Sequence, residues 1–142
     1  MREIMVDTNP IKYCFSTSGN TKENLAVGNE LKKLIGLNRY VRLYITDIQQ
    51  IEAMDIFKQA ENLKRKSFSK LNEVQRTLIV FANIVRVIGI TIDEKMLGRM
   101  KRYNEKHSGK LMKIADMAIA MTARDYGLQI LSNDGHVRNF SE

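Results

Sequence analysis

The chain has 142 residues, 44% of them hydrophobic, with 23 Lys and Arg against 16 Asp and Glu. We expect residues 1–142 to form one domain, because this length and this apolar content suffice for a single core. The one cysteine, Cys14, excludes an internal disulfide and a zinc cage made of several thiolates. The net charge of +7 favours a polyanionic partner such as nucleic acid.

The apolar run before Asp7 is shorter than the core of a secretion signal. No later segment approaches the roughly 20 apolar residues that a membrane helix needs. A lone cysteine also suits a reducing compartment. We therefore expect a cytoplasmic protein without a membrane partner.

The first half of the chain opens with a short apolar run at residues 4–6, which has the pattern of a buried parallel strand. Thr21 can cap a helix over residues 21–34, in which apolar side chains recur at helical spacing. A second strand pattern follows at residues 41–45. Asp47 can cap the next helix, which is expected over residues 48–66.

The helical pattern over residues 72–87 is apolar on more than one face. Ile79, Val80 and Ile84 widen its inward stripe beyond that of an ordinary amphipathic helix. A helix of this kind is deeply buried or meets a partner. We expect it to form, together with the helix over residues 48–66, a homodimer contact or a groove for another protein.

A third strand pattern occupies residues 87–90, and Asp93 can cap a basic helix that runs to about Glu105. The last helix is expected over residues 113–127 and leads into a fourth strand at residues 128–131. Strands therefore alternate with helices, which predicts an α/β fold, a three-layer α/β/α sandwich around a central parallel sheet. Ligands of such folds bind at the carboxyl ends of the strands.

Asp116 is the most informative residue, because the rest of the stretch over residues 113–127 reads as a buried helix. Such a helix seldom keeps an unpaired carboxylate unless something uses it. Asp7 and Asp134 follow strands at the expected mouth of a site, and Glu52 lies on an amphipathic helix. Four carboxylates that meet there supply the oxygen ligands that Mg²⁺ and Mn²⁺ prefer.

Two of these acids also have a simpler interpretation. Asp7 could cap a turn at Asn9-Pro10, and Asp134 could be a turn residue beside Gly135. Each of these turn interpretations explains a single acid and not the presence of several acids together. The combination of acids at several strand ends favours the site.

The other two acids differ in how many rivals they have. Asp55 and Glu61 share the helix of Glu52, but Glu52 aligns with its apolar face. Asp116 has no such rival, since Asp125 near the end of the same helix is expected to face water.

Basic residues cluster at residues 64–70 and again at residues 99–113. Solvated helix ends are their plain interpretation, but the second cluster directly precedes the Asp116 helix and could hold phosphates beside the acids. His136 is either a proton donor to a leaving oxygen or a surface residue. His107 is expected to face solvent.

Four short motifs occur in a fixed order along the chain. They are MVDTN at residues 5–9, ITDIQQIE at residues 45–52, ADMAIA at residues 115–120 and LSND at residues 131–134. In these motifs the chain resembles PIN-domain ribonucleases, especially toxins of the VapC type, over essentially its whole length. The segments Asp7-Thr8-Asn9 and Ser132-Asn133-Asp134 are the most specific.

The resemblance implies a PIN-like α/β/α fold and an endoribonuclease that cleaves single-stranded RNA with Mg²⁺ or Mn²⁺. It also implies an antitoxin protein as a partner. The implied catalytic and metal-binding acids are Asp7, Glu52, Asp116 and Asp134. The implied supporting polar residues are Thr8, Asn9, Ser132 and Asn133.

The chain departs from the family pattern after Asp134, where Gly135-His136-Val137 stands in place of a further acid. A module that binds RNA or protein without a competent metal site is therefore an alternative function. A phosphoacceptor receiver-like domain is a third. A receiver-like domain would require a paired acid next to the first strand and a lysine late in the chain, and neither is evident.

Overall fold

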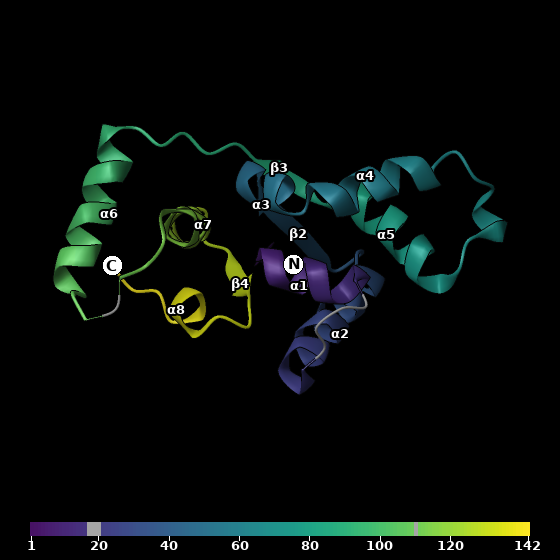
Figure 1. The fold of residues 1–142 in the computed structure, drawn as a ribbon, viewed down its shortest axis with the longest axis horizontal. Helices are drawn as coiled ribbons and strands as arrows, with labels where there is room; N and C mark the ends of the chain where they lie inside the picture. The colour runs from purple at the N-terminus through teal and green to yellow at the C-terminus, as the bar shows by residue number, and fades with distance from the viewer. Residues whose placement is uncertain (17–20, 110) are drawn as a thin grey trace.

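The computed structural model describes residues 1–16, 21–109 and 111–142. A four-stranded parallel sheet in the order β3-β2-β1-β4 forms its centre (Figure 1). The strands are β1 (Arg2–Val6), β2 (Val41–Thr46), β3 (Arg86–Ile88) and β4 (Gln129–Leu131). All four expected strands are therefore present, and the first strand lies inside the sheet.

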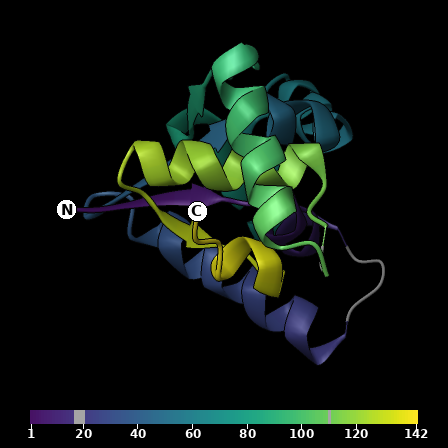
Figure 2. The same cartoon turned by 90° about the vertical axis from the view of Figure 1, so that its left-hand side faces the viewer.

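Helices connect the strands and cover the sheet. They are α1 (Thr8–Phe15), α2 (Lys22–Gly36), α3 (Asp47–Glu52), α4 (Met54–Leu63), α5 (Glu73–Ile84), α6 (Glu94–Lys106), α7 (Ile114–Asp125) and α8 (Gly135–Arg138), with a 3₁₀ turn, η1, at Phe68–Lys70. Figure 1 shows β1 and β2 in the middle, with α4 and α5 on one side and α6, α7 and α8 on the other. Figure 2 shows α6 crossing α7, with α8 below them.

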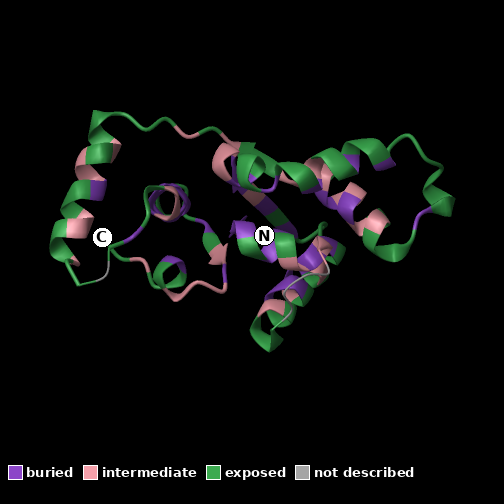
Figure 3. Ribbon diagram, in the orientation of Figure 1, coloured by how far each residue is buried: buried purple, intermediate pink, exposed green. Residues whose placement is uncertain are grey.

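Alternate residues of β1 bury themselves on opposite faces of the sheet, as a strand inside a sandwich requires. Ile4 and Val6 enter a core formed with α1, α2, α4 and α5. Met5 points the other way and packs against Ile119 and Ala123 of α7. The buried segments of Figure 3 accordingly lie where the helices meet the sheet.

The remaining surface of α7 forms a second core with α6 and α8. Met117 and Met121 are fully buried there, together with Met100 of α6 and Val137 of α8. These flexible side chains fill the space between the helices. The helix that carries Asp116 is thus fixed on two sides.

Two helix starts differ from the expectation. Thr46, not Asp47, caps α3, and the side chain of Gln49 completes a capping box with it. Asp47 is the first helical residue, and its carboxylate accepts the N–H group of Ile90 at 3.3 Å instead. The single helix expected over residues 48–66 is divided at Ala53, which is fully buried.

The end of α7 also differs from the expectation. The helix stops at Asp125, and Gly127 adopts a φ of +67°, a left-handed conformation that favours glycine. The N–H group of Leu128 then reaches back to the carbonyl of Ala123 at 2.8 Å. Gly127 therefore ends the helix instead of continuing the face of Asp116.

The apolar width of α5 has an explanation within the chain. Leu78 and Phe81 are buried, and Ile79 and Ile84 are partly buried against the same core. Asn72 caps the helix through a second capping box.

Among the described helices, none combines the length and the apolar character that crossing a bilayer requires.

Candidate active site

Asp7 lies at the carboxyl end of β1, where it caps the first helix. Its Oδ1 accepts the N–H group of Thr8 at 2.8 Å, and its Oδ2 accepts the hydroxyl of Ser132 at 2.7 Å. The residue is buried. Asp7 thus caps the helix α1 and not a turn at Asn9-Pro10, and the same carboxylate also joins the ends of β1 and β4.

Thr8 brings Glu52 to the same place. Its hydroxyl donates to Glu52 Oε1 at 2.8 Å, although the two residues are far apart in the sequence. Because α3 ends at Glu52 and Ala53 interrupts the helix, the glutamate stands at a corner of the backbone. Glu52 is otherwise exposed.

Ser132 connects Asp134 to Asp7. The N–H group of Asp134 donates to Ser132 Oγ at 3.0 Å, while the hydroxyl of Ser132 donates to Asp7. Asp134 Oδ1 accepts the N–H group of His136 at 2.9 Å and so caps α8. Ser132 therefore positions two acids at once, and the His136 side chain is exposed.

Asp116 occupies the first turn of α7 and is half-buried. Burial raises the pKa of its carboxyl above the ordinary value of 3.8, and the charges of Asp7, Asp134 and Glu52 raise it further. Lys113, one turn earlier, opposes the rise. The charges of the other three acids expected from the sequence therefore act on Asp116.

The pKa of Asp7 is also raised, chiefly by burial. The hydrogen bonds from Ser132 and Thr8 lower it, and the carboxylates of Asp134 and Glu52 raise it again. The two hydrogen bonds thus stabilise the ionised carboxylate of Asp7, whereas burial and the neighbouring carboxylates destabilise it. A cation in this position would remove the repulsion.

The donor set fits a hard divalent cation, because it consists of carboxylates without histidine or cysteine. Among the described residues, however, no three or more Asp, Glu, His or Cys side chains are placed so that they could hold a metal ion. Cys14 is buried in the core, and burial raises the pKa of its thiol to about 12. A thiolate nucleophile at neutral pH is therefore excluded.

The remaining polar residues of the two motifs have different positions. Asn9 is exposed in the first turn of α1. Asn133 donates through Nδ2 to Asn24 Oδ1 at 2.8 Å and so ties the end of β4 to α2. Asn133 thus supports the loop that presents Asp134.

Gln49 is a supporting residue that sequence analysis missed. It is fully buried, and its Nε2 donates to the Val6 carbonyl at 3.1 Å. Its Oε1 accepts the N–H group of Thr46 at 2.8 Å. The side chain joins the ends of β1 and β2 directly before Asp7, and the Thr-x-x-Gln spacing of a capping box was the available signal.

The basic cluster at residues 99–113 is only partly available to a ligand. Arg99 is held by Asp125, with Nη1 at 2.7 Å from Oδ2, and by Glu142. Asp125 is exposed but ion-paired. His107, expected to face solvent, is half-buried and stacks on Tyr103 with 4.3 Å between ring centroids, so that expectation was wrong.

Comparison with solved structures identifies similar folds at low sequence identity. One is VapBC2 from Rickettsia felis, bound to a DNA fragment from its promoter, with a TM-score of 0.55, 17% identity, and coverage of 93% of this chain and 87% of that chain. Another is FitAcB from Neisseria gonorrhoeae, with a TM-score of 0.53, 21% identity, and coverage of 95% and 90%. No protein-family model and no curated protein sequence matches the chain. The similarities confirm the expected fold class, an α/β sandwich with a central parallel sheet flanked by helices.

The raised pKa values predict an unusual pH dependence of stability without metal. Because Asp7 and Asp116 bind protons more tightly when folded, their contribution to the free energy of unfolding falls as pH rises above about 4. Thermal melts in EDTA should show a smaller loss of Tm as the pH rises from about 4 to neutrality for Asp116→Asn than for the unaltered chain. Identical pH profiles for the two proteins would show that Asp116 is not under this repulsion.

Proposed function

We propose that this chain is a metal-dependent endoribonuclease for single-stranded RNA and acts as the toxin of a toxin–antitoxin pair. The observation that carries the proposal is the hydrogen-bonded cluster in which Ser132 and Thr8 connect Asp7, Asp134 and Glu52 where β1 and β4 end, with Asp116 of α7 under the influence of their charges. Ligands of parallel α/β sheets bind at this edge. The fold similarity to VapBC2 and FitAcB supports the same assignment.

The four acids are the proposed ligands of one or two Mg²⁺ or Mn²⁺ ions. When bound, such ions activate water and neutralise phosphate charge. Ser132 and Thr8 fix the orientations of Asp7 and Glu52 through their hydrogen bonds, so the carboxylates are held before substrate arrives. The buried position of Asp7 limits water around it, which strengthens its interaction with a cation.

Charge supports RNA as the substrate. The chain carries a net charge of +7, and exposed Lys101, Arg102 and Lys106 follow one another along α6. Lys113 lies close enough to Asp116 to lower the pKa of that acid. Cations beside an acidic centre can hold the phosphates that the carboxylates alone would repel.

We further propose an antitoxin protein as the partner and a homodimer as the functional unit. The similar VapBC2 structure is a complex bound to promoter DNA, which supports a two-component system here. The apolar residues Ile51, Met54 and Val87 are exposed around a hollow of about 420 Å³ between α4 and α5. An uncovered apolar surface of this kind is typical of protein contacts.

A binding module without catalytic activity is a second candidate. It is favoured by the sequence after Asp134, where Gly135 and exposed His136 supply no further carboxylate. In that case the chain would hold RNA or protein without cleaving it. A cleavage assay separates the two functions.

The purified chain is expected to cleave mixed single-stranded RNA when Mn²⁺ or Mg²⁺ is present. EDTA should abolish cleavage, and high salt should weaken it because fewer phosphate contacts survive screening. Hydrolysis by water leaves 5′-phosphate and 3′-hydroxyl ends, which terminal mapping detects. Products with 2′,3′-cyclic phosphates would contradict the proposal, since such ends come from attack by the ribose 2′-hydroxyl.

A further inference from the structure

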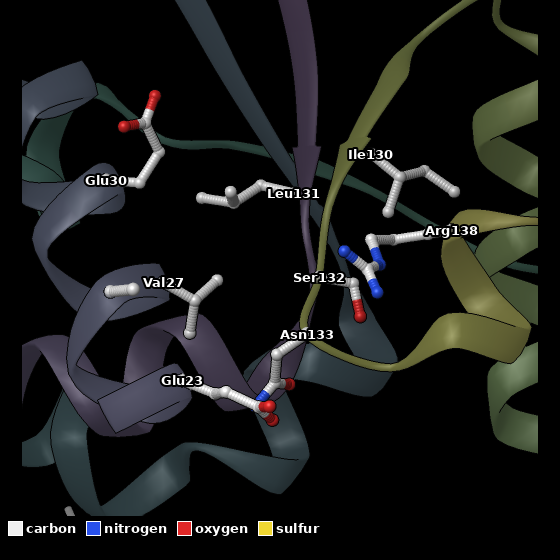
Figure 4. A pocket seen from close by; sticks show the side chains of 9 residues that line it. Glu23, Val27, Glu30, Ile130, Leu131, Ser132, Asn133 and Arg138 are labelled. Carbon is white, nitrogen blue, oxygen red and sulfur yellow. The ribbon is translucent and has the colours of Figure 1, made fainter. Parts of the chain in front are cut away.

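A groove with a cavity volume of about 530 Å³ lies beside the last strand of the sheet, between α2 and α8 (Figure 4). One wall is the side of α2 that carries Glu23, Val27 and Glu30. Leu131 of β4 lies opposite Val27, and Arg138 of α8 extends over the other side. Ser132 and Asn133 also line the groove, which therefore adjoins the proposed nuclease site, although none of its four acids is among the lining residues.

The α2 wall combines negative charge with an apolar surface. Glu23 and Glu30 are two helical turns apart and share one side of the helix, with Ala26 and Val27 between them. The ion pairs of the described residues involve neither glutamate. Although the chain has a net charge of +7, these two acids make the α2 wall locally negative, so this wall attracts a cation. A Lys or Arg side chain fits such a wall, because its stem packs on apolar atoms while its head reaches the carboxylates.

The floor of the groove belongs to a strand with a free side. β4 is the outermost strand and pairs with β1 alone among the described strands. The Leu131 carbonyl accepts the N–H group of Asp7 at 3.0 Å, so the peptide groups of Ile130, one residue earlier, point to the outer edge. An edge that is unpaired in this way can pair with an added strand.

A second hollow lies on the other face of the same strand. It has a volume of about 320 Å³ and is lined by Leu128, Val137 and Phe140, and it shares Ile130 and Arg138 with the groove. Successive side chains of an extended peptide point to opposite faces. A strand added beside β4 would therefore direct alternate side chains into the two hollows.

We propose that the edge of β4 docks an extended segment of a partner protein, which directs a Lys or Arg side chain at Glu23 and Glu30. RNA is the less favourable occupant, because the two glutamates, which outnumber Arg138 among the charged residues of the groove, repel phosphates. The inference does not rest on the nuclease proposal. None of the four acids of that site contributes to the contact.

The test uses the full chain and a short fluorescent peptide that alternates arginine with valine. A second peptide carries glutamate in place of arginine. Fluorescence anisotropy should detect saturable binding of the arginine peptide only, with amide NMR shifts concentrated at residues 129–131. Glu23→Lys combined with Glu30→Lys should weaken binding about tenfold, since two attractive charge pairs become repulsive.

Matched controls separate this contact from general charge effects. Glu94→Lys combined with Glu105→Lys places the same charges on exposed positions of α6 and should leave the affinity unchanged. Asp116→Asn should also leave it unchanged, which excludes binding at the acidic site. The nuclease proposal can fail in its cleavage assay without altering any of these results.

Four outcomes would overturn the inference. They are no binding of the arginine peptide, equal binding of the glutamate peptide, equal loss of affinity in the α6 control, and loss in Asp116→Asn. If RNA instead moved the same amide signals and bound more tightly to the Glu23→Lys, Glu30→Lys chain, the groove would belong to RNA. A drop in molecular mass caused by these two substitutions, measured by light scattering, would assign the edge to a second copy of the chain.

Discussion

Asp116→Asn is expected to abolish RNA cleavage while leaving the metal-free protein as stable as before or more stable. The carboxylate is half-buried, and its charge is opposed by Asp7, Asp134 and Glu52. Asparagine keeps the shape of the side chain and removes that repulsion. Thermal melts in EDTA should therefore show an equal or higher Tm for the variant.

Manganese should separate the two proteins further. An ion that binds the folded chain raises its Tm in proportion to the logarithm of the ion concentration over Kd. The unaltered chain should gain stability with Mn²⁺, and Asp116→Asn should lose most of that gain. A site that trades stability for activity behaves in this way.

Asp55→Asn is the matched control, because Asp55 also lies in the first turn of a helix and is exposed. The variant should lose at most about 0.3–1 kcal/mol of stability, from the interaction of Asp55 with the helix dipole, and keep full cleavage. If Asp116 were structural, its asparagine variant would melt lower by about 1–3 kcal/mol and cleave normally per folded molecule. That result would remove the central acid from the proposed mechanism.

The strands and the long helices could be predicted because their signals are local. Thr21, Asn72 and Asp93 do start helices, and each accepts a backbone N–H group three residues later. The strand patterns were also found, although β3 begins one residue earlier than expected and ends at Ile88. These elements depend on periodicity and caps that the sequence displays directly.

The two helices that the sequence did not reveal, α1 and α8, lie at the site itself. Asn9-Pro10 reads as a turn, yet Pro10 occupies the first turn of α1, where a missing N–H group costs no hydrogen bond. The helix α8 has four residues and is too short for a periodic pattern. Asp7 caps α1 and Asp134 caps α8. The same residues therefore indicated both a turn and a functional site in the sequence.

Contacts between distant segments explain what else was missed. Nothing near Gln49 indicates that its amide binds the Val6 carbonyl, because that bond exists only once β1 and β2 are neighbours. Ser132 likewise receives its double role from the pairing of β1 with β4. The types of residue at the site were readable from the sequence, whereas the bonds that orient them depend on tertiary structure.

Asp7 should give the second large effect, because its carboxylate has a structural and a proposed catalytic role. Both Asp7→Asn and Asp7→Ala are expected to abolish cleavage. Asp7→Asn keeps an oxygen for the Thr8 N–H group, whereas Asp7→Ala leaves this donor and the buried Ser132 hydroxyl without an acceptor. Asp7→Ala should therefore be less stable than Asp7→Asn by about 1–3 kcal/mol in urea unfolding with EDTA.

Asp93 provides the control, since it is also an N-cap, of α6, where it accepts the N–H group of Met96 at 2.9 Å, but it stands at an exposed position. Asp93→Ala should lose about 1 kcal/mol and Asp93→Asn very little, both with normal cleavage. In the Asp7 pair, stability should thus follow the hydrogen bonds while activity follows the charge. If Asp7→Asn cleaved RNA at the normal rate, Asp7 would be a cap and a strand link only, and the remaining three acids would have to hold the metal without it.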